Sequence, residues 1–361
     1  MLRKFSFQKL VLLLAVLIFL IAIFTWDISL NIQKDNNSTF DVEESFEKLE
    51  NVTWELLYSP DNAWLSFYEN ISNIDDSLKI QTYDFTNKTL KSEFKKLLDR
   101  WVDIKLIMEN YKYQQFKNTR RDISNYFTGY KNFEIKSDEQ MWTEYIHSKI
   151  NLTDSGFWIQ TANLTNSSFH SNREHFFYST DTWVWQSLNT IFEKDWNGEE
   201  IKFEDIHPNL VVCNVNCRDV IEYILNLADK SILIQTQYIV DDSILEILKD
   251  KVVLNKSSPL TGSSFEKGAQ YWFDMRFVVG ATETNDELLA YFWPAVARKF
   301  DRYYNHTKMI LVDGEILLLW SMNLSDNSLD KNREVGILII DKDVINQFKK
   351  MFEKDRENST Y

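Results

Sequence analysis

Short apolar runs alternate with amphipathic segments over the part of the chain that begins near Thr53. Runs bounded by polar or turn residues indicate strands, and apolar positions at helical spacing indicate helices. Their order, β-α-β-α-β, is typical of a mixed or parallel sheet covered by helices. The expected elements are a strand at 54–58, a helix at 61–74, a strand at 78–83, a helix at 89–101 and a strand at 102–108.

The same order occurs a second time from Asn209 onward. The triplet Ile80-Gln81-Thr82 returns as Ile234-Gln235-Thr236, at an offset of about 154 residues. An internal duplication follows, and we expect two lobes, residues 51–205 and 206–356. The expected elements of the second lobe are strands at 210–213, 231–237 and 275–279 and helices at 217–227, 242–248 and 287–303.

The N-terminus carries an uncharged apolar run from Leu10 to Trp26. At about 1.5 Å per residue it would span roughly 25 Å, enough for a bilayer core. Basic residues precede the run and acidic residues follow it, and bulky residues at its end disfavour cleavage as a signal peptide. We therefore expect a single-pass signal anchor, with a cytoplasmic tail (1–9), a transmembrane helix (10–26), a polar linker (27–50) and an extracytoplasmic catalytic region.

Composition narrows the class of partner. The chain has 361 residues, 44% of them hydrophobic, and a formal net charge of −14. Proteins that bind nucleic acid usually carry a basic footprint, so the acidic balance lowers that expectation without excluding a local basic groove. Cys213 and Cys217 are the two cysteines, and their spacing allows either a short disulfide or two small buried thiols.

One polar skeleton occurs in both predicted lobes. His306-x-Lys308-x4-Asp313 leads to Ser321-x-Asn323 and then to Asn332-Arg333-Glu334. Upstream, at an offset of about 159 residues, the first copy has His147-x-Lys149-x4-Asp154, Thr161-x-Asn163 and Asn172-Arg173-Glu174. One copy alone could be a solvated strand edge, but two copies in matching context indicate a site.

This skeleton resembles the phospholipase D superfamily, whose members carry two His-x-Lys-x4-Asp motifs. The resemblance implies an α/β fold of two β-α-β-α-β lobes with mixed sheets and one shared active-site cleft. It also implies a phosphohistidine intermediate, with His147 as nucleophile and His306 as general acid. The sequence departs from the pattern at Trp320, where glycine is usual, and at Gln160-Thr161 in place of Gly-Ser.

The residue types suit a phosphodiester substrate. On a strand, His and Lys two positions apart project from the same face. Histidine can attack phosphorus or protonate a leaving oxygen near neutral pH, and lysines neutralise the non-bridging oxygens, so no metal or cofactor is required. We expect catalysis by His147, Lys149, His306 and Lys308, phosphate binding and orientation by Asn163, Asn323, Thr161, Ser321, Glu174 and Glu334, and structural roles for Asp154 and Asp313.

The expected function is a membrane-anchored phospholipase D-type phosphodiesterase that hydrolyses or transfers phosphatidyl groups. The alternatives are an extracytoplasmic nuclease of the same superfamily, a cardiolipin synthase-like phosphatidyltransferase, and a non-catalytic protein that kept the fold. One chain supplies both half-sites, so a monomer suffices.

Overall fold

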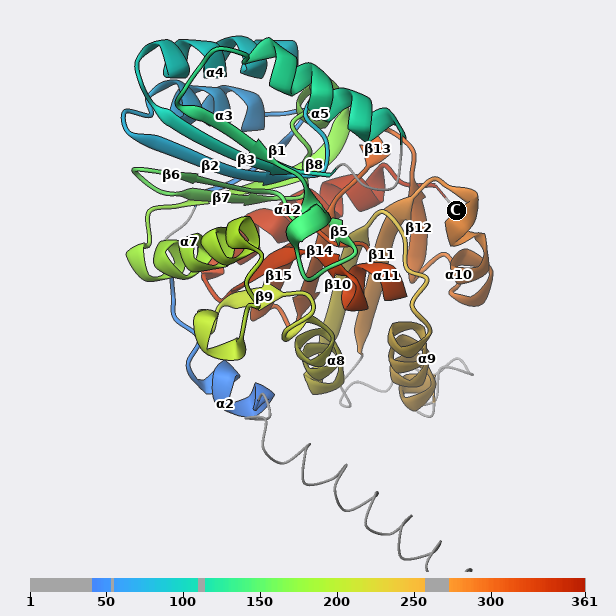
Figure 1. Ribbon diagram of the computed structural model, residues 1–361. Coiled ribbons are helices and arrows are strands. Elements are labelled where there is room, and N and C mark those ends of the chain that lie inside the picture. The colour runs from blue at the N-terminus through green and yellow to red at the C-terminus, as the bar shows by residue number, and fades with distance from the viewer. Residues whose placement is uncertain (1–40, 53–54, 110–113, 257–272, 361) are drawn as a thin grey trace, which may run out of the picture. The chain divides into compact units, whose positions relative to one another are not determined.

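The computed structural model describes residues 41–361, apart from 53–54, 110–113, 257–272 and 361. Residues 44–361 form one compact unit that contains two large mixed sheets (Figure 1). The expected α/β fold with mixed sheets is confirmed.

The first sheet has the order β1-β8-β7-β6-β2-β3-β4, and the short strand β13 pairs with β8. Its central strand is β6, and the neighbouring β2 pairs antiparallel with β6 and in parallel with β3. The strands are β1 Glu55–Ser59, β2 Ser77–Thr82, β3 Asp103–Met108, β4 Phe133–Lys136, β6 Ile150–Thr153, β7 Phe157–Gln160, β8 Asn172–Ser179 and β13 Tyr304–Asn305.

The second sheet has the order β12-β11-β10-β14-β15-β17-β9 and repeats this plan. Here β10 pairs in parallel with β11 and antiparallel with β14, as β2 does with β3 and β6. The strands are β9 Leu210–Val212, β10 Ser231–Thr236, β11 Asp274–Gly280, β12 Ala297–Phe300, β14 Lys308–Val312, β15 Ile316–Trp320 and β17 Val335–Ile339.

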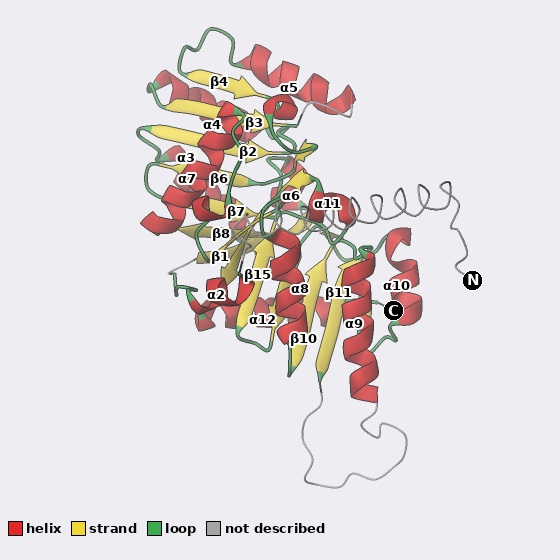
Figure 2. Cartoon of the chain, turned by 60° about the horizontal axis from the view of Figure 1, so that its bottom comes forward, coloured by secondary structure: helices red, strands yellow, loops and turns green. Residues whose placement is uncertain are grey.

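Helices cover the sheets, and α8 and α9 run alongside β10 and β11 (Figure 2). A buried apolar cluster joins β6 and β7 of the first sheet, β15 and β17 of the second, and helices α7 and α12. The longer helices are α3 Ala63–Ser72, α4 Lys88–Asp99, α5 Gln114–Tyr126, α7 Thr182–Asn197, α8 Cys217–Leu227, α9 Asp242–Lys256 and α12 Lys342–Glu357; the shorter ones are α2 Val42–Glu47, α6 Asn166–His170, α10 Asp286–Tyr291 and α11 Asp326–Asp330.

Two short strand pairings join the halves of the sequence. β13, just before His306, pairs with Asn172 and Arg173 of β8. β5 (Tyr145–Ile146), just before His147, pairs with β16 (Asn332–Arg333). The residues that lead into each histidine are thus hydrogen-bonded to the Asn-Arg that precedes the glutamate of the other copy.

Two sequence predictions are corrected. The expected helix at 287–303 ends at Tyr291 and is followed by β12, because Pro294 lacks the amide proton that a helix interior needs. The predicted transmembrane anchor is wrong as well: in the described part of the chain, no helix is both long and apolar enough to cross a bilayer. Its predicted span, 10–26, and most of the predicted linker, 27–50, lie outside the described residues.

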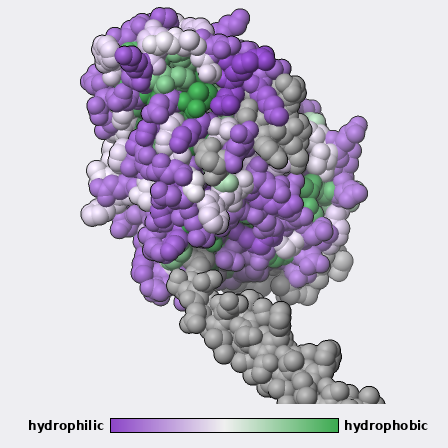
Figure 3. Space-filling view, viewed as in Figure 1, coloured by the Kyte–Doolittle hydropathy of each residue, from purple (hydrophilic) through white to green (hydrophobic). Residues whose placement is uncertain are grey.

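The predicted localisation, a single-pass protein with an extracytoplasmic catalytic region, depended on that anchor and is corrected with it. The face shown in Figure 3 is mainly hydrophilic, and its apolar side chains gather in a few small patches.

Candidate active site

Each histidine stands at the entrance to a motif strand, and its imidazole contacts the glutamate of the other sequence copy. Nδ1 of His147 lies 2.7 and 2.9 Å from the two carboxylate oxygens of Glu334. Nδ1 of His306 lies 2.8 Å from Oε2 of Glu174. The short pairings of β5 with β16 and of β13 with β8 impose this crossing. Neither copy therefore makes a complete histidine–glutamate pair on its own.

Both glutamates are fully buried and each accepts two further hydrogen bonds. Ser321 Oγ donates to Glu334 over 2.6 Å and Thr161 Oγ1 to Glu174 over 2.7 Å. The remaining donors are the amides of Asn332, 3.2 Å from Glu334, and Asn172, 3.1 Å from Glu174. Sequence reasoning missed both asparagines, although their recurrence in the two Asn-Arg-Glu triplets was the available signal.

Electrostatics favours neutral imidazoles facing ionised glutamates. Burial, reinforced by the nearby lysines, lowers the pKa of His147 to about 4, although Glu334 opposes the shift. Burial likewise lowers the pKa of His306. Burial alone would raise the pKa of Glu334, but the neighbouring His147 and Lys149 bring it below its ordinary value. Since an ionised carboxylate only accepts, Nδ1 of each histidine must donate, which leaves a lone pair on Nε2.

The two motif lysines belong to the same site as both histidines. Each lysine lowers the pKa of both imidazoles, so the four groups lie within electrostatic range of one another. The Nζ of Lys149 donates to the carbonyl of His147 and that of Lys308 to the carbonyl of His306. Burial lowers the pKa of Lys149 to about 8 and that of Lys308 to about 7, against the pull of the glutamates.

Both histidines remain reachable from outside. The side chain of His147 is 14% exposed and that of His306 is 12% exposed, whereas both glutamate side chains are completely buried. A substrate can therefore contact the imidazoles while the carboxylates behind them stay away from water.

Three tyrosines that sequence reasoning did not single out line this region. The ring of Tyr83 meets that of His147 edge-on, with centroids 4.9 Å apart. The ring of Tyr304 stacks on His306 at 6.1 Å and an interplanar angle of 19°. The hydroxyl of Tyr238 accepts a hydrogen bond from Asn323. The available signal was recurrence: Tyr304 precedes His306 by two residues, as Tyr145 precedes His147, and Tyr83 and Tyr238 follow the two Ile-Gln-Thr triplets.

The two motif asparagines, Asn163 and Asn323, follow the second strand of each motif hairpin. Their Oδ1 atoms are buried and have no hydrogen-bond partner among the described residues. The amide nitrogen of Asn323 donates to Tyr238 over 3.0 Å.

Asp154 and Asp313 lie at the far ends of the motif strands and bind backbone amides. Asp154 accepts from the N–H groups of Asp75 and Asp76. Asp313 accepts from three consecutive N–H groups, residues 229–231, over 2.7 to 2.9 Å. Both carboxylates thus hold the loop that enters the neighbouring antiparallel strand, β2 beside β6 and β10 beside β14.

The two departures from the superfamily pattern are filled by packing. Trp320 is fully buried and faces Gly336 of β17, where an added Cβ would lie 2.6 Å from the Cβ of Trp320. The tryptophan is accommodated because its partner strand carries glycine at that position. Gln160 is also buried, and its amide donates to the carbonyl of Ala162 within the turn that leads to Asn163.

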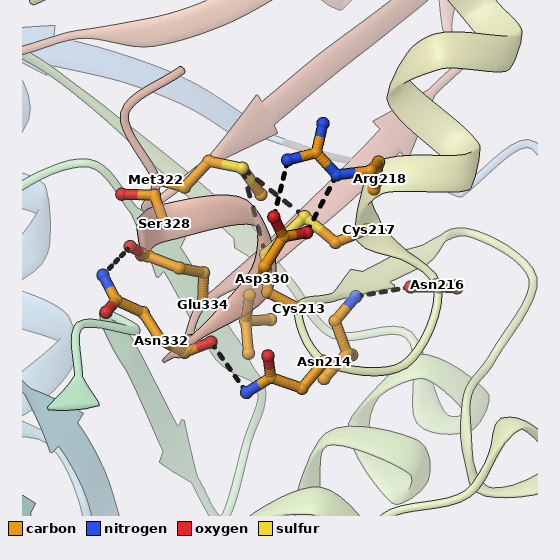
Figure 4. The surroundings of a disulfide bond; sticks show 12 residues. Cys213, Asn214, Asn216, Cys217, Arg218, Met322, Ser328, Asp330, Asn332 and Glu334 are labelled. Carbon is orange, nitrogen blue, oxygen red and sulfur yellow. Dashed lines mark hydrogen bonds and ion pairs between the residues drawn. A yellow bond between two sulfur atoms is a disulfide. The ribbon is translucent and has the colours of Figure 1, made fainter. Parts of the chain in front are cut away.

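Cys213 and Cys217 form a disulfide next to this site (Figure 4). The Sδ of Met322 lies 3.5 Å from Cys217 Sγ, and Met322 is flanked in sequence by Ser321 and Asn323. The backbone N–H of Cys213 donates to the carbonyl of Glu334 over 3.1 Å. The disulfide-closed turn therefore contacts the segment that carries Glu334.

A comparison with protein families decides the class. The model described as "Cardiolipin synthase, PLD-like domain" matches residues 67–196 and 221–356, and so includes both polar skeletons. The chain belongs to this family. Its place in the phospholipase D superfamily, predicted from the two motifs, is confirmed.

Individual relatives match over shorter stretches of the chain. A cardiolipin synthase of Oceanobacillus iheyensis is 25% identical over 195 residues, which cover 48% of this chain and 39% of that enzyme. Cardiolipin synthase 1 of Staphylococcus epidermidis is 39% identical over 54 residues, 15% of this chain and 11% of that enzyme. The matched stretches thus span well under half of either relative.

Solved structures of the same fold are similar over most of the chain. Phosphatidylserine synthase of Haemophilus influenzae superposes with a TM-score of 0.61 at 13% identity, over 88% of this chain and 91% of that one. Polyphosphate kinase of Porphyromonas gingivalis gives 0.59 at 11% identity, over 83% and 50%. At these identities the likeness shows the fold of this family member alone.

Proposed function

We propose that this family member is a phosphatidyltransferase that moves a phosphatidyl group from a phospholipid headgroup to the hydroxyl of a second lipid. The crossed pairing of two histidines with two buried glutamates, beside two buried lysines, carries the proposal. The cardiolipin synthase character of the family model and of the curated relatives supports transfer over hydrolysis. Hydrolysis, in which water is the acceptor and which the sequence analysis placed first, is therefore the second candidate.

In the first step, Nε2 of His147 attacks phosphorus and the bond from phosphorus to the headgroup oxygen breaks. His306, in its protonated form, gives its proton to the departing oxygen. Glu334 keeps the Nδ1–H tautomer of His147 and so leaves the Nε2 lone pair free. Lys149 and Lys308 offset the negative charge that builds on the non-bridging oxygens.

In the second step, the acceptor hydroxyl gives its proton to His306 as its oxygen attacks phosphorus. The phosphorus–nitrogen bond breaks and His147 returns to its starting state. Glu174 stabilises the imidazolium that His306 forms, as the buried carboxylate of a catalytic triad does. We assign Asn163 and Asn323 to the non-bridging oxygens, because both side chains stand at the turn that follows the second strand of each motif hairpin.

The test uses vesicles of phosphatidylglycerol, whose glycerol headgroup offers both a leaving alcohol and an acceptor hydroxyl. We expect a diphosphatidyl product and free glycerol from the wild-type chain, and neither from His147→Ala. Phosphatidic acid as the main product would return the protein to hydrolysis. Cleavage of a single-stranded oligonucleotide, with the lipid untouched, would move it to the nuclease branch.

A further inference from the structure

A buried ion pair reaches from each Asn-Arg-Glu triplet into a helix of the other half. The Nε of Arg333 donates to Asp195 of α7 over 3.2 Å, and its Nη1 donates to the carbonyl of Cys213 over 2.8 Å. The side chains of Arg333 and Asp195 are only 2% and 1% exposed. The arginine next to Glu334 is thus fixed by the helix that packs on the sheet of His147.

Further hydrogen bonds close this ion pair into a ring that returns to His147. The second carboxylate oxygen of Asp195 accepts from the amide of Gln81 over 2.9 Å. The other end of that amide, Oε1, accepts from Ser148 Oγ over 2.6 Å. The backbone carbonyl of Arg333 accepts from the N–H groups of both His147 and Ser148. The path from Glu334 through the arginine, aspartate, glutamine and serine ends at the histidine that Glu334 binds.

The other half repeats the path but leaves it open. Arg173 pairs with Asp355 of α12 over 2.9 Å, and Gln235 donates to the same carboxylate over 2.8 Å. Oε1 of Gln235 is buried and has no hydrogen-bond partner in the described part of the chain. Thr307, which occupies the place of Ser148, donates instead to Asn305 over 2.7 Å.

Such rings are poor sources of stability, because desolvation of a buried ion pair offsets most of its attraction. A fully satisfied buried network does rigidify its members, and the orientation of catalytic groups is sensitive to small displacements. The ring around His147 therefore suits orientation better than it suits stability.

We propose that Gln81 and Asp195 are positioning residues for His147, acting through Ser148 and Arg333, and that the open path through Gln235 leaves His306 less tightly held. The closed ring fixes the backbone of His147 and the carboxylate of Glu334 with respect to one another. The kinetic test of this inference rests on the proposed function, whereas the test by NMR of the histidine side chains does not.

The test exchanges the amide and the carboxylate inside the ring. Gln81→Glu places two carboxylates face to face, and Asp195→Asn leaves the Arg333 charge without its partner. The double variant Gln81→Glu/Asp195→Asn can form every hydrogen bond of the ring and keeps the net charge. In it the amide at position 195 donates to the carboxylate at position 81, the reverse of the wild-type direction. We expect each single variant to lose about 10²-fold in kcat at nearly constant KM. We expect the double variant to recover at least tenfold over the weaker single variant.

Additive losses in the double variant would overturn the proposal, because residues that act through one network are not additive. Ser148→Ala, which removes one ring hydrogen bond and no charge, covers the case in which the charged single variants fail to fold. We expect a roughly tenfold fall in kcat for it, and an unchanged kcat would also overturn the proposal.

The matched control is Gln235→Leu beside Gln81→Leu. Gln235→Leu breaks one hydrogen bond of an open path, so we expect kcat to fall less than about threefold. Gln81→Leu breaks two hydrogen bonds of a closed ring, so we expect kcat to fall by about 10²-fold. Equal losses in the pair would contradict the inference.

Imidazole ¹⁵N spectra give a readout that needs no substrate. We expect Gln81→Leu to change the Nδ1–H tautomer signals of His147 and to leave those of His306 in place. This result would stand even if the wild type transferred no phosphatidyl group. Unchanged His147 signals would contradict the positioning role of Gln81, whatever the substrate proves to be.

Discussion

The half-site of His147 and the half-site of His306 use the same residue types but hold them differently. His147 faces both oxygens of its glutamate, meets the ring of Tyr83 in a T-shaped contact and sits in a closed polar ring. His306 faces one glutamate oxygen, stacks on Tyr304 and ends an open path. The face of an aromatic ring stabilises a cation, and Tyr304 presents its face to His306.

This difference matches the division of labour that we propose. A nucleophile gains from a neutral, fixed imidazole, while a general acid must pass through the imidazolium form. The duplication gives both histidines the same strand arrangement, whereas the side chains around each histidine differ between the two halves.

The largest effect is expected from loss of either histidine, with a difference that reveals its role. His147→Ala and His306→Ala should each lower kcat/KM on a natural phospholipid by at least about 10³-fold. A donor with a p-nitrophenol leaving group needs no proton, so it should restore His306→Ala by about 10²-fold and leave His147→Ala inactive. Equal restoration of both variants, measured by nitrophenol release, would abolish the distinction between the halves.

Loss of a glutamate should come next. Glu334→Gln and Glu174→Gln should each cost about 10² to 10⁴-fold in kcat, because a buried amide can present a donor to Nδ1 and reverse the tautomer. The p-nitrophenol donor should be processed far better by Glu174→Gln than by Glu334→Gln. The opposite order would mean that each glutamate serves the histidine of its own copy.

The pH dependence of kcat/KM should follow the motif lysines. The pKa of Lys308 is lowered to about 7 and that of Lys149 to about 8, so their positive charges are lost as pH rises through this range. We expect kcat/KM to fall there by about tenfold per pH unit or more, in addition to the loss that sets in at lower pH where His306 gives up the proton it needs as general acid. The profile should be level only where His306 is protonated and His147, whose pKa is about 4, is still neutral.

Lys308→Arg keeps its charge at every pH measured, since an arginine side chain titrates above about pH 12. This variant should lose the fall in kcat/KM near pH 7 and keep the fall near pH 8. Lys149→Arg is the control, and it should keep the fall near pH 7. A profile that does not change in Lys308→Arg would assign that fall to another group.

A smaller effect is expected at the aromatic contacts. Tyr304→Leu removes the face that stacks on His306, so the pKa of His306 should fall further and kcat should drop about three- to tenfold. Tyr83→Leu removes a T-shaped contact rather than a stacked one and should change the pKa of His147 less. Proton NMR titration of the two imidazoles measures both shifts, and a larger shift in Tyr83→Leu would reverse the comparison.

The smallest catalytic effect is expected at the motif aspartates. Asp313→Ala removes three backbone hydrogen bonds at a residue with φ of 54°, while Asp154→Ala removes two. Urea unfolding should show losses of about 2–3 and about 1–2 kcal/mol in free energy of unfolding. kcat per folded molecule should change less than about threefold, and a loss of turnover without loss of stability would give the aspartates a chemical role.

Sequence patterns predicted the class of fold because it depends on local periodicity, and they indicated the residues of the candidate site because one polar skeleton occurs twice. The repeat of Ile-Gln-Thr and of the polar skeleton indicated duplication, and the structure shows the matching pairings of β2 and β10. The helix expected at 287–303 failed because Pro294 and pairing with β11 outweighed apolar spacing.

The crossing of Glu334 to His147 and of Glu174 to His306 was out of reach of the sequence. It depends on two-residue strands whose partners lie more than 120 residues away, and no spacing rule encodes such a pairing. The role of Arg333 was missed for the same reason, since Asp195 stands alone in sequence and meets the arginine only through packing of α7. Long-range pairing, rather than local propensity, assembled the site.

The central claim is that each half completes the other, and trapping of the covalent intermediate tests it most directly. Wild type, Glu334→Gln and Glu174→Gln would be mixed with phosphatidylglycerol vesicles, quenched in alkali within one turnover and digested for mass spectrometry. We predict phosphate on the peptide of His147 in the wild type, its loss in Glu334→Gln and its presence in Glu174→Gln. Phosphate on the peptide of His306, or loss of the His147 label in Glu174→Gln alone, would contradict the account.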